Sequence, residues 1–215
     1  MTKYSQIAMI DILTPRSIEY YQKLRKMGVN DAIIRLSTSN YSSYFEIASI
    51  HTDLAKRSGM RVHASLATDL TNPFHDARYF FATYQRLGYS FGSKTMIQCL
   101  PDDRVKDPAK RLHELLGYIS YFVNKDDIDI AVDKRYIDEN RLKIADIPDY
   151  FNLTIINVNK LNSGIDRAGT WIYTDNFEGE LQYLGYDYYG FYTKEGYQLS
   201  LDAEYVAQEG DTWVT

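Results

Sequence analysis

The chain has 215 residues, of which 45% are hydrophobic and 25% are charged, and its formal net charge is -5. This composition suffices for one substantial hydrophobic core and excludes a disordered chain. Because Lys and Arg form no long run, the charge pattern indicates binding neither to nucleic acid nor to a membrane surface.

Cys99 is the only cysteine, so an internal disulfide and a zinc site built from several cysteines are both excluded. We expect it to be a buried strand residue. The apolar run at residues 7–13 contains Asp11 and is too short and too charged for a signal-peptide core. We therefore expect a chain that is cytoplasmic as made, with later release or association with a phage left open, and no segment long enough to span a membrane.

Apolar runs alternate with helical spacing along most of the chain. Strands are expected at residues 7–13, 32–36, 61–67, 94–100, 128–132 and 153–158. Helices are expected at residues 15–27, 44–58, 73–87 and 108–122, with a shorter one at 136–142. Gly28, Gly59 and Gly88 follow the first three helices, where a C-terminal cap belongs.

The last third is less regular, with strands expected at residues 170–173 and 182–192 and little room for helices between them. Alternation of strands and helices favours a parallel sheet in an α/β protein. A single (β/α) TIM-like barrel, irregular in its last quarter, fits better than an open doubly wound sheet, which would carry a Gly-rich phosphate loop. We assign residues 1–193 to this barrel and residues 194–215 to a C-terminal strand or extension.

Five segments place polar or aromatic residues at characteristic points of this pattern. In chain order they are Met9-Ile10-Asp11-Ile12, Ile33-Ile34-Arg35-Leu36-Ser37, Leu54 to Val62, Asp76-Ala77-Arg78-Tyr79-Phe80-Phe81, and Trp171-Ile172-Tyr173-Thr174 with Asp187 beyond it. Their order and spacing resemble the family 25 glycoside hydrolases, the lysozymes of phage lysins and bacterial autolysins. The resemblance spans roughly residues 7–192 and implies a flattened barrel with its groove at the C-terminal strand ends.

The resemblance also implies an Asp-x-Glu at the end of the fourth strand, with the Glu as the acid that protonates the leaving sugar. The alignment places Gln98 at the Asp position and Leu100 at the Glu position. Neither side chain can donate a proton at useful pH, and loss of a general acid lowers the rate about 100- to 10,000-fold. The expected active site is therefore degenerate.

Asp11 and Asp187 match the two supporting carboxylates of the family and are interpreted as remnants of its catalytic set. A structural role is the alternative for both, with Arg35 as the natural partner of Asp11. Asp102 and Asp103 follow the fourth strand after Pro101 and are candidate substitute acids, unless they belong to a solvated loop. Arg35, Trp171 and Tyr173 occupy positions that the resemblance assigns to ligand binding.

No metal and no cofactor are expected, because His51, His63, His75 and His113 do not pair at metal-ligand spacing. We favour a non-catalytic descendant of a peptidoglycan muramidase that binds a cell-wall glycan or a protein partner. One alternative is an active muramidase with a displaced acid at Asp102 or Asp103. Another is a phage-encoded structural or interaction module that uses the Tyr-rich segment 183–197 as its contact surface.

Overall fold

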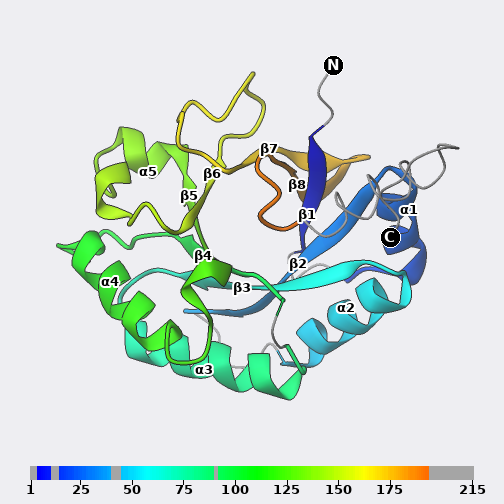
Figure 1. The fold of residues 1–215 in the computed structure, drawn as a ribbon, viewed down its shortest axis with the longest axis horizontal. Helices are drawn as coiled ribbons and strands as arrows, with labels where there is room; N and C mark the ends of the chain where they lie inside the picture. The colour runs from blue at the N-terminus through cyan, green and yellow to red at the C-terminus, as the bar shows by residue number, and fades with distance from the viewer. Residues whose placement is uncertain (1–3, 11–14, 40–44, 90–91, 194–215) are drawn as a thin grey trace, which may run out of the picture.

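A computed structural model describes residues 4–10, 15–39, 45–89 and 92–193 (Figure 1). The strands are β1 (Ser5–Ile10), β2 (Val29–Thr38), β3 (Arg61–Thr68), β4 (Thr95–Cys99), β5 (Ile128–Asp133), β6 (Asn152–Ile156), β7 (Thr170–Phe177) and β8 (Glu180–Asp187). The α-helices are α1 (Ile18–Lys26), α2 (Phe45–Arg57), α3 (Pro73–Arg86), α4 (Pro108–Ile119) and α5 (Lys134–Asp138). Short 3-10 helices are η1 (Lys125–Asp127) and η2 (Ile144–Asp146).

The strands close into one barrel in the order β1 to β8. Strands β1 to β7 run parallel, whereas β8 is antiparallel to both of its neighbours, β7 and β1. The predicted single barrel with an irregular last quarter is therefore confirmed. We call the end where β1 to β7 finish and β8 begins the barrel mouth, and the other end the amino end.

Side chains alternate between the barrel interior and the layer beneath the helices, as the period of a strand requires. The interior is filled by a compact apolar cluster that includes Ile7, Ile33, Met96 and Ile172. The larger cluster lies outside the barrel, between the strands and the helices. Counting in steps of two from these interior residues therefore identifies which residue at each strand end points inward.

Glycines end the first three helices as predicted. Gly28, Gly59 and Gly88 have φ of +89°, +78° and +66°, a backbone conformation that glycine adopts without steric cost. Helix α1 begins at Ile18 rather than at the predicted Pro15. The physical reason is Arg16, whose guanidinium donates to the Glu180 carboxylate and so holds the preceding chain against the β7–β8 hairpin.

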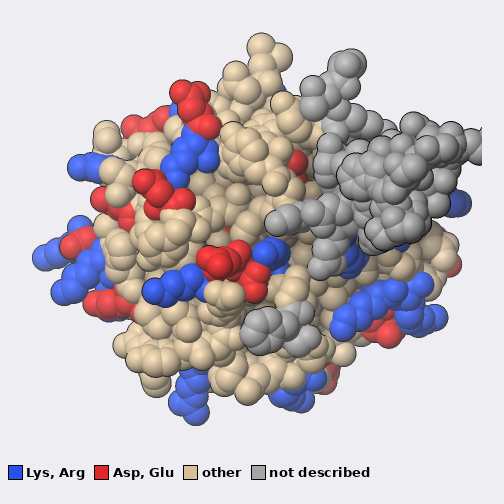
Figure 2. Space-filling model, in the orientation of Figure 1, with Lys and Arg blue, Asp and Glu red and all other residues tan. Residues whose placement is uncertain are grey.

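Helices cover the barrel unevenly. Figure 1 shows α2, α3 and α4 along one side, whereas β7 and β8 on the other side carry no comparable helix. Among the described residues, none of the helices combines the length and apolarity needed to cross a bilayer. Figure 2 shows basic and acidic side chains interspersed on the visible face, so neither sign of charge dominates it.

The last quarter departs from the prediction in two places. Strand β8 ends at Asp187 and not at Tyr192, because residues 188–193 turn across the amino end and bury Tyr192. Helix α5 covers residues 134–138 rather than 136–142, because the Asp133 side chain caps it by accepting a hydrogen bond from the Arg135 N–H. The predicted extension at residues 194–215 lies outside the described residues.

Candidate functional site

Strand β4 delivers Gln98 to the barrel interior near the mouth. The register pairs it with Ala67 on β3 and Ala131 on β5, and its exposure is 8%. Leu100 follows the end of β4, is half-buried, and donates its N–H to the Thr68 carbonyl at 2.8 Å. The two positions where the resemblance requires carboxyl groups therefore lie at the mouth, next to the adjoining strands.

Arg35 lies on β2 and reaches Gln98 across the barrel, where its Nη2 donates a hydrogen bond to the Gln98 Oε1. The amide oxygen can accept this bond, but the amide has no proton to give to a leaving group. The prediction that Arg35 lies at the site agrees with this placement. Asp11, its other predicted partner, lies outside the described residues.

The two candidate substitute acids lie on the loop after β4. Asp102 accepts hydrogen bonds from the Arg104 backbone N–H and Nε, both at 2.8 Å. These bonds lower the pKa of Asp102 to about 2, whereas a general acid needs a raised pKa. Asp103 is exposed and pairs with Arg141 at 2.8 Å. A catalytic role for Asp102 and Asp103 remains a prediction, and their ion pairs with Arg104 and Arg141 argue against it.

Asp187 is not brought to the mouth. It pairs with Ser5 at the start of β1, so it lies at the amino end of the barrel. Its carboxylate accepts backbone N–H groups of Phe191, Tyr192 and Thr193 at 2.9 to 3.0 Å. Burial is the largest influence on this carboxyl group and raises its pKa. The geometry therefore assigns Asp187 to closing the amino end instead of to the predicted catalytic set.

Trp171 and Tyr173 also lie away from the barrel interior. Both flank the inward Ile172, so they point to the outer face of β7. Tyr173 stacks on Tyr186 at 4.4 Å between ring centroids, and Trp171 donates its indole N–H to the Asn157 carbonyl at 3.0 Å. The residues predicted to bind ligand are thus part of an aromatic layer outside the barrel.

The structure brings two further carboxylates to the mouth. Because the register aligns the ends of β3, β4 and β5, Asp69 and Asp133 flank Leu100 from the neighbouring strands. Asp69 accepts the Thr71 N–H at 2.8 Å, and Asp133 accepts the Arg135 N–H at 2.8 Å. Sequence reasoning missed both, although alternation from the buried strand residues places each on the inward side.

A cavity of about 390 Å³ adjoins Asp133 at this end of the barrel. Residues of α5 line one side, and Ile156, Asn157 and Val158, at the end of β6, line the other. Its size is at the lower end of the range for small-molecule sites. The mouth therefore offers room for a ligand next to the Asp133 carboxylate and the Asn157 amide.

Asp76, on α3, is hydrogen-bonded to residues at the mouth ends of β2 and β3. It is 2% exposed and accepts hydrogen bonds from the Ser39 and Thr68 hydroxyl groups, both at 2.7 Å. Burial raises its pKa, and the two hydroxyl bonds act in the opposite direction. This residue, part of the segment that carried the resemblance, ties the ends of β2 and β3 to α3.

Neither a metal site nor a reactive cysteine is found in the described part of the chain. No three His, Cys, Asp or Glu side chains there are grouped to hold a metal ion. Cys99 is fully buried, as predicted, and burial raises its pKa to about 12, so its thiol is a poor nucleophile. His63 faces the barrel interior at the amino end and contacts Asp31 at 3.2 Å.

No family model matches this sequence, and no curated protein sequence matches it either. Solved structures do match. The catalytic domain of the endolysin ply40, from a bacteriophage of Listeria monocytogenes, superposes with a TM-score of 0.70 at 12% identity, covering 90% of this chain and 98% of that one. A family 25 glycosyl hydrolase from Bacillus anthracis gives 0.65 at 16% identity, with 87% and 91% covered.

The modular autolysin LytC from Streptococcus pneumoniae, in complex with a synthetic peptidoglycan ligand, gives a TM-score of 0.68 at 14% identity and 84% coverage of this chain. The chain spans 46% of the length of that autolysin. The fold is thus a closed α/β barrel with one antiparallel strand, the architecture of the solved structures that match. More narrowly, it is the fold of the family 25 lysozymes, as the sequence resemblance predicted.

Proposed function

We propose that this chain binds a cell-wall glycan at the barrel mouth and does not hydrolyse it. One observation carries the proposal: the end of β4 presents Gln98 and Leu100 at the two positions where the family resemblance implies carboxyl groups. Without a carboxylic acid at the scissile bond, the leaving oxygen has no proton donor.

The remaining carboxylates of the mouth support binding better than acid catalysis. Asp69, Asp102 and Asp133 each accept hydrogen bonds from the backbone of their own loops. A carboxylate accepts several hydrogen bonds, so these groups can also accept from sugar hydroxyls. The Gln98 amide can both donate to and accept from the same ligand.

The proposed class of ligand rests on the similarity of this fold to solved structures. A solved autolysin of this fold was obtained with a synthetic peptidoglycan ligand, and the other matches are an endolysin domain and a glycosyl hydrolase. A cell-wall glycan is therefore the first candidate for the mouth of this barrel. We also propose a localisation: the chain meets this glycan after release from the cell or as part of a phage particle.

The test pairs lysis with binding on purified bacterial cell walls. The wild-type chain is expected to leave the turbidity of the suspension unchanged and to sediment with the walls. The double variant Gln98→Asp/Leu100→Glu is expected to clear the suspension, because it restores both carboxyl groups. Ile50→Glu is the matched control, since Ile50 is 56% exposed and lies on α2, outside the barrel.

Clearing by the wild-type chain would end the proposal. In that case Asp102→Asn and Asp103→Asn decide whether a displaced acid is responsible, since lysis through these groups would disappear in the double variant. Loss of sedimentation in Gln98→Ala, with Ile50→Ala unchanged, assigns binding to the mouth. Sedimentation that is equal in all variants would place the wall contact elsewhere on the chain.

A further inference from the structure

A second cavity, of about 430 Å³, lies at the amino end of the barrel. It is lined from the end of α2, the start of β3, the turn before β4 and the segment after β8. We infer that this cavity binds a small phosphate monoester, such as a sugar or polyol phosphate. The inference does not rest on the glycan proposal, because the two sites lie at opposite ends of the barrel.

The charge of the lining carries the inference. Lys56, Arg61 and Lys94 all line the cavity, and none of the described residues that line it is an Asp or a Glu. The chain as a whole has a net charge of -5, so this concentration of cations runs against its overall balance. Cations that surround a concave site attract an anion of complementary charge.

Acidic residues outside the lining hold two of the cations in place. Arg61 donates two hydrogen bonds of 2.7 Å to Asp31, which is 1% exposed. The Lys94 ammonium donates to Asp127 at 2.6 Å. An ammonium group has three donors, so Lys94 can bind a ligand oxygen while it keeps this bond. Positions fixed in this way reduce the entropy lost on binding.

Lys56 is the third cation and belongs to the last turn of α2. Its ammonium lies 5.7 Å from the centre of the Tyr89 ring, a cation–π contact. Its side chain is exposed, so substitution there should leave the packing intact. Lys56 is therefore the position at which charge can be changed with the least effect on the fold.

An apolar wall favours a monoester over bare phosphate. Phe191 lines the cavity and lies 4.8 Å from the Lys94 ammonium, ring centre to nitrogen. His63 and Tyr192 complete the wall, and both are buried and hydrogen-bonded within the barrel. A phosphate can thus meet the cations while a short carbon chain or sugar ring packs on Phe191.

The experiment measures binding of glycerol 3-phosphate and of inorganic phosphate by isothermal titration calorimetry. Glycerol 3-phosphate should bind the wild-type chain several-fold more tightly, with an affinity that falls as salt increases. Lys56→Glu should weaken it about tenfold or more, because a cation becomes an anion at contact distance. Lys56→Arg should stay within about threefold of the wild type, since it keeps the charge.

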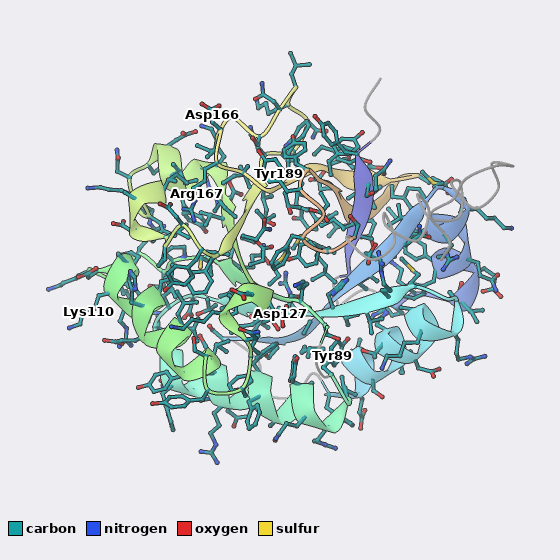
Figure 3. The ribbon with its side chains drawn as sticks, viewed as in Figure 1. Tyr89, Lys110, Asp127, Asp166, Arg167 and Tyr189 are labelled. Carbon is teal, nitrogen blue, oxygen red and sulfur yellow. The ribbon has the colours of Figure 1, made fainter. Side chains whose placement is uncertain are left out.

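Lys110→Glu is the matched control. In Figure 3, Lys110 lies at the opposite end of α4 from Asp127, and it lines a different cavity. This variant should bind as the wild type does, and thermal unfolding without ligand should show that every variant folds. Equal weakening by Lys110→Glu, or unchanged binding by Lys56→Glu, would overturn the inference. So would equal affinity for both ligands, or no saturation by about 10 mM ligand.

Discussion

Asp129 gives this barrel an expected dependence of stability on pH that one substitution can isolate. It lies on β5, is fully buried, and accepts hydrogen bonds from the Thr154 hydroxyl at 2.6 Å and the Asn152 amide at 2.9 Å. The Tyr192 hydroxyl donates to the same carboxyl group. Burial outweighs these bonds and raises the pKa of Asp129 to about 6.

The sign follows from linkage. The native chain holds this proton more tightly than the unfolded chain, where the pKa of an Asp is about 3.9. The stabilising contribution of Asp129 is therefore complete below about pH 4 and is lost as pH rises through about 6. A difference of about two pKa units corresponds to about 3 kcal/mol in the free energy of unfolding.

Asp129→Asn removes this titration. Urea denaturation of both proteins between about pH 4 and pH 7 should show the variant gaining about 3 kcal/mol relative to the wild type as pH rises. Asp166→Asn, at an exposed position labelled in Figure 3, is the matched control and should run parallel to the wild type. Parallel curves for Asp129→Asn and the wild type would refute the reasoning, whatever their offset.

Three further substitutions test the frame around the site, each by urea denaturation at neutral pH. Arg167→Ala should lower the free energy of unfolding by about 2 to 3 kcal/mol, because the guanidinium donates to backbone carbonyls of residues 144, 147, 148 and 151. Asp76→Ala should lower it by about 1 to 3 kcal/mol, since the buried Thr68 hydroxyl loses its acceptor. Glu178→Asn should raise it by about 0.5 kcal/mol, because Asn tolerates the φ of +54° at this hairpin turn better than Glu does.

Each of these predictions has a distinct contrary result. Arg167→Ala with wild-type stability would mean that water replaces the four carbonyl bonds without loss. Asp76→Ala with wild-type stability would mean that the Ser39 and Thr68 hydroxyls find other acceptors. A less stable Glu178→Asn would show that the ion pair between Lys23 and Glu178 outweighs the turn conformation.

Local patterns in the sequence sufficed for the barrel and for the glycines that end its first three helices. The joints at Gly28, Gly59 and Gly88 were predictable because a left-handed residue at a helix end strongly favours glycine. The parallel strands were predictable because buried strands appear as continuous apolar runs between helices. These features depend on neighbours in the chain and need no knowledge of distant contacts.

The direction of β8 could not be predicted in the same way. A two-residue turn at Glu178 and Gly179 reverses the chain, and both residues have positive φ, of +54° and +85°. This pair is not one of the Asn-Gly or Asp-Gly pairs that announce such a turn. A parallel β8 would be the eighth parallel strand and would put Asp187 at the mouth, whereas the antiparallel strand puts it at the amino end.

The carboxylates beside Leu100 were missed for a related reason. Asp69 and Asp133 are more than sixty residues apart in the chain, and only the register of β3, β4 and β5 brings them to one level. Sequence order instead drew attention to Asp102 and Asp103, which follow Leu100 after Pro101. A motif read along one strand cannot reveal groups that the neighbouring strands supply.

These flanking carboxylates sharpen the restoration experiment. A carboxyl group introduced by Leu100→Glu would stand between Asp69 and Asp133, and like charges nearby raise the pKa of a carboxyl group. Because Leu100 is only half-buried, the substitution should cost no more than about 1 kcal/mol of stability. NMR titration should place the pKa of the introduced group above its usual value of about 4.3, the direction that a general acid needs. A pKa at or below that value would mean that Asp69 and Asp133 do not face this position. In that case, a failure of Gln98→Asp/Leu100→Glu to clear cell walls would not count against the proposed loss of hydrolysis.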